Sequence, residues 1–353
     1  MVMRRVFNHH VCLCVLSTAI LAGLALMTSQ NKVYAQAKNC EGVDSGRENQ
    51  PIVCDGTTDG RGWGNGTGAT NGEWGVLSGK RDIDMSEHSG QAAVTVYNKS
   101  GRETAKITIS SKLTVTDSRS SSQMPAIKVY QQGELKLVGD VNVTGVKKGI
   151  VVEGPGSSVT VMTGSIEVRA KGGPVIEVKN NGKAVLMEEV KVTGSGSRDG
   201  VGVLIENGGE VTLMKGVTMK NVKTGMKIMG TTGIATVRGG ATITVGQNGT
   251  GLEVEGNANV VELEIKGNGG NGMGVLINGS GTVVMTKVTM KDVITGARVS
   301  GGVLRMIGDS TINVAESGTG FNVTGGKVVM EGGSITVGVG GKGMNVWGGR
   351  LLW

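Results

Sequence analysis

Four glutamates form the densest acidic cluster of the sequence and are its best candidates for acid–base chemistry. Glu253 and Glu255 alternate with apolar residues, and Glu262 and Glu264 follow closely. Carboxylates two residues apart on a strand share one face at ~7 Å, a separation that suits an inverting glycosidase. The same alternation also places charged residues on the solvent face of any half-buried strand. We therefore expect no catalytic residues, and keep a carbohydrate-active enzyme as the alternative.

Patterns for other catalysts, metals and cofactors are missing from the sequence after residue 37. His88 is the only histidine there, which leaves no Ser-His-Asp set and no histidine partner for a metal at Cys40 and Cys54. The glycine-rich stretch 196–200 is followed by no expected helix that could hold a phosphate. We expect no cofactor and no metal, and predict a disulfide between Cys40 and Cys54.

The charge balance favours anionic partners. The chain has 36 Lys and Arg against 29 Asp and Glu, a net charge of +7, which falls to +4 without Arg4, Arg5 and Lys32. A modest positive excess favours surfaces such as glycosaminoglycans. Aromatic residues are only 3%, so we expect no base-stacking platform and no nucleic-acid binding. The candidate contact residues lie near predicted turns or face outward: Lys147, Lys148, Lys220, Lys223, Lys291 and Trp347.

Residues 1–37 have the pattern of a secretory signal peptide. Arg4 and Arg5 precede a long apolar stretch over 11–27, and Ala35-Gln36-Ala37 offers a cleavage site after either alanine. Cleavage is favoured over retention as a membrane anchor, because serine, threonine and glycine interrupt the stretch. An exported chain reaches an oxidising compartment, where Cys40 and Cys54 can pair.

A repeat dominates the sequence from about residue 126. Each unit opens with glycine followed by an apolar residue and contains three short alternating stretches, such as Leu252-Glu253-Val254-Glu255. The openings are Ile150, Pro174, Val201, Met226, Leu252, Met273, Ala297, Phe321 and Met344. They are 21 to 27 residues apart, a period typical of a β-solenoid. We predict an all-β, right-handed parallel β-helix with about 24 residues per coil over 94–353.

The segment 38–93 is predicted to cap the N-terminal end of this β-helix. Nine glycines fall between residues 55 and 79, with Trp63 and Trp74 among them. Together with the expected disulfide, such a segment would cover an open parallel edge, which otherwise invites aggregation.

The sequence resembles the passenger domain of Gram-negative autotransporters. The resemblance rests on the signal ending Tyr34-Ala35-Gln36-Ala37, the early cysteine pair, and coils such as residues 272–277 with Val288-Thr289-Met290. It implies a secreted or surface-exposed adhesin or virulence factor, or a released ligand of mitogenic type. Its partner would be a host-cell surface protein or a glycosaminoglycan.

The resemblance also implies an outer-membrane translocator barrel, and the sequence ends at Trp353 without one. We therefore expect a passenger that is truncated at its C-terminus. A non-functional remnant of a truncated gene is a further alternative.

Overall fold

The computed structural model describes residues 40, 48–56, 74–88, 90–99, 105–196, 200–268 and 271–353. All of them belong to the second of two compact units, Ala35–Trp353. The predicted signal peptide and most of the glycine-rich stretch between residues 55 and 79, with Trp63, lie outside the described residues.

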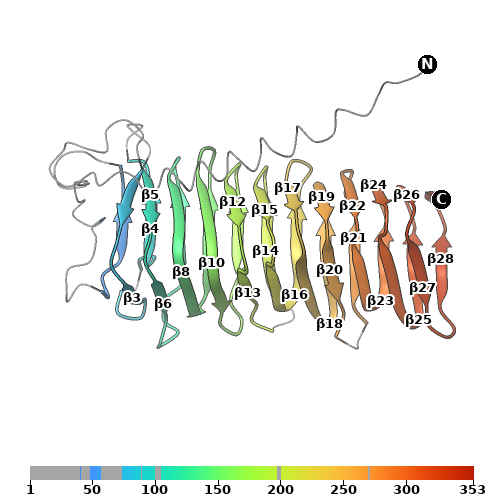
Figure 1. The fold of residues 1–353 in the computed structure, drawn as a ribbon, viewed down its shortest axis with the longest axis horizontal. Helices are drawn as coiled ribbons and strands as arrows, with labels where there is room; N and C mark the ends of the chain where they lie inside the picture. The colour runs from blue at the N-terminus through green and yellow to red at the C-terminus, as the bar shows by residue number, and fades with distance from the viewer. Residues whose placement is uncertain are drawn as a thin grey trace, which may run out of the picture. The chain divides into compact units, whose positions relative to one another are not determined.

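The described residues form 29 strands and no helix, and every strand pairing is parallel (Figure 1). The chain passes along three faces in each turn and then stacks the next turn on the last. The predicted β-solenoid with roughly 24 residues per turn is therefore confirmed, with the consecutive turns side by side from β3 to β28 in Figure 1.

Face 1 holds the strands that follow the repeat openings. Its separate strands are β1 (Ile52–Cys54), β4 (Val94–Tyr97), β7 (Pro125–Tyr130), β9 (Lys148–Glu153), β11 (Ile176–Lys179), β14 (Val201–Glu206), β21 (Met273–Ile277) and β28 (Lys342–Val346).

Face 2 follows after a short turn. Its separate strands are β2 (Gly75–Leu77), β5 (Lys106–Ile109), β12 (Lys183–Leu186), β15 (Glu210–Leu213), β17 (Ile234–Val237), β19 (Asn257–Val261), β22 (Thr282–Thr286), β24 (Val303–Ile307), β26 (Lys327–Glu331) and β29 (Arg350–Leu352).

Face 3 completes the turn. Its separate strands are β3 (Arg81–Asp84), β6 (Leu113–Thr116), β13 (Lys191–Thr193), β20 (Leu263–Lys266) and β27 (Ser334–Val337). Six longer strands bend around a corner and serve two faces. Faces 2 and 3 share β8 (Glu134–Val146) and β10 (Ser158–Val168), and faces 3 and 1 share β16 (Thr218–Met229), β18 (Ala241–Val254), β23 (Thr289–Val299) and β25 (Thr311–Val323).

The register on face 1 corrects three of the predicted openings. The residues that stack on one another are Ile127, Ile150, Ile176, Val203, Met226, Leu252, Val275, Ala297, Phe321 and Met344. Pro174, Val201 and Met273 are therefore each two residues too early. Val201 and Met273 instead stack on the threonines that precede an opening, Thr224 and Thr250.

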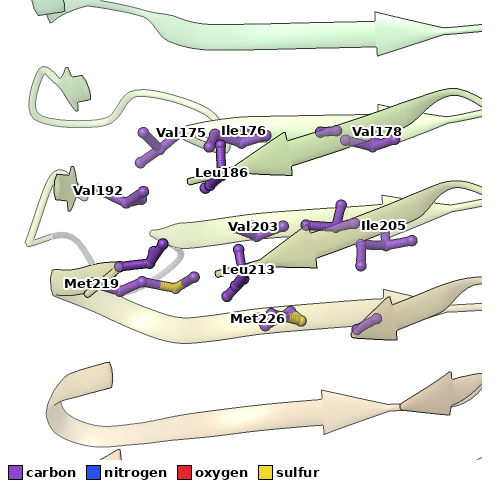
Figure 2. Packing of buried hydrophobic residues seen from close by; sticks show 14 of the residues in the cluster. Val175, Ile176, Val178, Leu186, Val192, Val203, Ile205, Leu213, Met219 and Met226 are labelled. Carbon is purple, nitrogen blue, oxygen red and sulfur yellow. The ribbon is translucent and has the colours of Figure 1, made fainter. Parts of the chain in front are cut away.

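The interior is one continuous column of aliphatic side chains. Alternate residues of most strands point inward and are almost fully buried, whereas those of β27, β28 and β29 are exposed or half-buried. Figure 2 shows how equivalent positions meet, with Leu186 above Leu213 and Val192 above Met219. Burying one such side chain contributes about 1.5–3 kcal/mol. A single turn cannot close this core, so each turn depends on its neighbours.

Close packing of the backbone explains the glycine that precedes most of the openings. A Cβ on Gly225 would lie 2.3 Å from Ile243 Cγ2, and 2.7 Å from the carbonyl oxygen of Gly251 in the next turn. Equivalent conflicts occur at Gly296 and Gly320. Glycine is favoured at these positions because an added side chain would collide with the next turn. Ala126 and Val175 occupy the same position before Ile127 and Ile176, so not every turn requires glycine there.

The N-terminal strands extend the same ladder. β1 pairs with β4, β2 pairs with β5 and β3 pairs with β6, all in parallel. The ladder therefore begins at Ile52, inside the range 38–93 that the sequence assigned to a cap.

Candidate functional site

The first two glutamates of the acidic cluster each contact a group of the preceding turn. Glu253 Oε1 lies 2.9 Å from Lys227 Nζ, its register neighbour in the preceding turn. Glu255 Oε2 accepts a hydrogen bond of 2.8 Å from the backbone N–H of Gly230. The proposed catalytic pair is thus engaged in two separate contacts that link turns of face 1.

The second pair of glutamates is engaged in the same way. Glu262 Oε1 lies 3.6 Å from Lys287 Nζ, and Glu264 lies between Lys266 at 2.8 Å and Lys291 at 2.6 Å. Burial alone would raise the pKa of Glu264, but the hydrogen bonds from these two lysines outweigh it and lower the pKa. A general acid needs a raised pKa, so Glu264 is tuned in the opposite direction.

All five predicted contact lysines lie at one corner of the solenoid, where face 3 leads into face 1. We call Lys147, Lys148, Lys220, Lys223 and Lys291 the lysine corner. They sit in or beside β9, β16 and β23, which are three turns apart from one another. At about 4.8 Å per turn, the three groups recur roughly every 14 Å along one edge.

The lysine corner contains both paired and unpaired side chains. Lys148 lies 2.8 Å from Glu177, and Lys291 is held by Glu264. Lys147 Nζ donates a 2.7 Å hydrogen bond to Gln123, and Lys223 Nζ donates one to the Asn248 carbonyl oxygen. Lys220 is exposed and, within the described ranges, Lys147, Lys220 and Lys223 face no carboxylate.

Sequence reasoning did not single out Lys266 as a member of this edge. Its register partner is Lys291, and both ammonium groups contact Glu264. The sequence could have indicated this neighbour, because Lys266 and Lys291 each follow a buried apolar residue on face 3, Ile265 and Met290.

The two remaining predictions concern Trp347 and the cysteines. Trp347 follows β28 and is 79% exposed, so its ring is available for contact.

Cys40 and Cys54 form a disulfide with 5.0 Å between their Cα atoms. Both cysteine side chains are buried in the core, and the bond joins Cys40 to the end of β1.

A groove that the sequence did not reveal lies at the corner between faces 1 and 2. Its volume is about 650 Å³. We call it the amide groove, and its lining residues are Asn98, Tyr130, Gln131, Gln132, Glu153, Gly154, Pro155 and Asn180.

The described part of the chain has neither a metal site nor a membrane-spanning helix. No three His, Cys, Asp or Glu side chains there gather as a metal site. Likewise, none of its segments forms a helix long and apolar enough to cross a membrane.

Comparisons with known proteins add no family. A scan of protein-family models, a search of curated proteins and a search of solved structures each found no match.

Proposed function

We propose that this chain is an exported, autotransporter-like passenger that binds host cells as an adhesin, at the cell surface or after release. The observation that carries the proposal is the lysine corner. It presents positive charge at regular intervals along one edge of a stiff stack of turns. A linear polyanion such as a glycosaminoglycan carries charge along its length, and can follow such an edge across several turns.

A binding role is favoured over catalysis by the state of the carboxylates. Two lysines lower the pKa of Glu264 and so favour its ionised form. Glu253 and Glu255 are each engaged in a contact with a neighbouring turn, to Lys227 and to the backbone N–H of Gly230. A glycosidase needs one carboxyl group that stays protonated near neutral pH. The acidic cluster therefore supports stacking of the turns better than it supports a reaction.

The unpaired lysines are expected to carry most of the affinity. Lys220 and Lys223 need not give up a carboxylate partner to meet a sulfate group, whereas Lys183 is already paired with Glu210 at 2.8 Å. An exposed ion pair is screened by salt and worth about 0–1 kcal/mol. Although such a pair adds little stability, the Glu210 carboxylate offsets the positive charge of Lys183.

The test is binding of the purified chain to cultured epithelial cells and to immobilised heparin across a salt series. We expect saturable binding that weakens as salt rises and falls several-fold in Lys220→Gln/Lys223→Gln. The matched control, Lys183→Gln/Lys227→Gln, removes the same charge from ion-paired positions and should change binding far less. Absence of cell binding, or equal losses in the two variants, would refute the proposal.

A further inference from the structure

The amide groove crosses four consecutive turns of the solenoid. Asn98, Gln131, Gly154 and Asn180 each follow a face 1 strand and occupy equivalent turn positions. Three steps of about 4.8 Å make the groove roughly 14 Å long. It is therefore an elongated surface that suits a short chain molecule better than a single small ring.

The turn in the middle of the groove carries few side-chain atoms. Gly154 and Gly156 flank Pro155, and a Cβ on Gly156 would lie 3.2 Å from Gln132 Cγ. Both glycines have positive φ, 91° and 77°, which L-residues rarely adopt. The turns on either side carry glutamine and asparagine at the same positions, so their side chains form the rim of the groove on both sides of Gly154 and Pro155.

The rim offers uncommitted hydrogen-bonding groups. Gln131 and Gln132 are exposed, and their side-chain amides bond to none of the described residues. Glu153 Oε1 accepts a 3.3 Å hydrogen bond from Asn180 Nδ2, which leaves its second oxygen available. An amide both donates and accepts, and a carboxylate accepts. Vicinal hydroxyl groups of a sugar need this combination.

One wall of the groove is aromatic. The rings of Tyr130 and Tyr97 stack with 4.9 Å between centroids and 5° between planes, and Lys128 Nζ lies 4.6 Å from the Tyr130 centroid. The chain has only three tyrosines, and two of them meet here. Because Tyr97 and Lys128 already contact the faces of this ring, Tyr130 offers a ligand chiefly its hydroxyl group, which can both donate and accept a hydrogen bond.

The charge of the lining favours uncharged carbohydrates over sulfated ones. No lysine or arginine lines the groove, and its one carboxylate is that of Glu153. The nearest lysines, Lys128 and Lys179, lie beside Tyr130 and Glu153 and outside the lining. A sulfated chain would bring its negative charge against this carboxylate. A peptide that binds by strand addition would need a free strand edge, but the neighbouring strands β7, β9 and β11 are already paired with one another.

We propose that the amide groove is a binding site for a neutral oligosaccharide. The inference goes beyond the lysine corner, because it concerns another corner of the solenoid and a ligand without charge. The two sites can succeed or fail independently, since heparin probes one and uncharged sugars probe the other.

The test uses cellotetraose, tetraacetylchitotetraose and lacto-N-tetraose as neutral probes, with a heparin tetrasaccharide as the charged comparison. Binding to the purified chain is measured by calorimetry and by saturation-transfer NMR. The main variant is Gln131→Gly/Gln132→Gly, which removes both amides. Glycine tolerates the positive φ of 49° and 65° at these positions. The matched control is Asn248→Gly. Asn248 is another exposed amide residue with positive φ, and it lies at the corner between faces 3 and 1.

We expect at least one neutral probe to bind and to lose tenfold or more in affinity in the glutamine variant and in Tyr130→Ala. Asn248→Gly should keep the parental affinity, and circular dichroism should show that each variant folds. The inference is overturned if no neutral probe binds, if the groove variants bind as well as the parent, or if heparin binding depends on these same residues.

Discussion

The guanidinium of Arg169 lies 2.5 Å from the carboxylate of Asp117, although 52 residues separate them. Asp117 is fully buried and also accepts backbone hydrogen bonds of 3.0 Å from Ser121 and Ser122. Arg169 Nη2 donates to the carbonyl oxygen of Ser122 at 3.0 Å. One side chain thus fastens the loop after β6 to a turn further along the solenoid.

Replacing Arg169 with methionine is expected to destabilise the protein strongly. The change leaves the Asp117 carboxylate buried without its counter-charge, which costs about 3–5 kcal/mol. Lys183→Met is the matched control, because Lys183 and Glu210 form an exposed pair worth less than about 1 kcal/mol. Urea unfolding followed by circular dichroism measures both changes. Similar losses in the two variants would contradict the burial argument.

The glycines that precede most openings predict a second difference in stability. A Cβ on Gly296 would lie 2.3 Å from Ile312 Cγ2 and 2.6 Å from the carbonyl oxygen of Gly320. Gly296→Ala should therefore destabilise the protein by about 1–3 kcal/mol, because the next turn must shift to admit the methyl group. The measurement is the free energy of unfolding in urea.

Gly343 supplies the control for that experiment. It occupies the equivalent position before Met344, but a Cβ there would meet nothing within 4 Å. Gly343→Ala should be neutral or stabilise slightly, because alanine reduces the entropy of the unfolded chain. If both alanine variants behave alike, crowding is not the reason for the repeating glycine.

The period of the solenoid could be predicted from sequence because alternation marks every inward residue. Leu252 and Val254 are buried while Glu253 and Glu255 are directed outward, as the pattern indicates. The phase of some turns could not be predicted. Gly200-Val201-Gly202-Val203 contains two glycine–valine steps, and a shift of two residues keeps every side chain on its own face. In the structure Val203 pairs with Met226, and a Cβ on Gly202 would lie 2.6 Å from the carbonyl oxygen of Gly225, a crowding that the sequence does not reveal.

The amide groove was beyond the reach of the sequence for a different reason. Its residues come from four turns, and turns follow no alternation that could mark them as a group. Tyr97 and Tyr130 were the available signal, since they occupy equivalent positions in a chain with few aromatic residues. The groove itself depends on Gly154 and Pro155, whose lack of polar side chains resembles an ordinary tight turn.

The stability of the N-terminal turn should depend on pH through Asp84. Burial alone would raise the pKa of this carboxyl group, but hydrogen bonds from Ser118 and Ser86 outweigh it and lower the pKa to about 2. The folded-state pKa is therefore below the unfolded value of 3.8. The associated stability is present above about pH 4 and is lost as pH falls towards 2.

Asp84→Asn removes this titration. The variant should be about 1–2 kcal/mol less stable than the parent at pH 6, after allowance for solvent screening, and the two should converge near pH 2. Urea unfolding at both pH values tests the sign. A difference that is the same at pH 6 and pH 2 would show that Asp84 acts through packing and not through its charge.

The disulfide is expected to stabilise one end of the solenoid and not the whole stack. Closing the 14-residue separation between Cys40 and Cys54 should contribute about 3 kcal/mol by restricting the unfolded chain. Each turn contacts only its neighbours, so the loss of stability in Cys40→Ser/Cys54→Ser should stay local.

Hydrogen exchange tests this prediction. The amide proton of Ile52, which is bonded to Ala93 O at 2.8 Å, should exchange much faster in the variant than in the parent. The amide of Ile150, bonded to Val175 O at 2.9 Å, should be unchanged. Equal acceleration at both amides would mean that the solenoid unfolds as one cooperative unit.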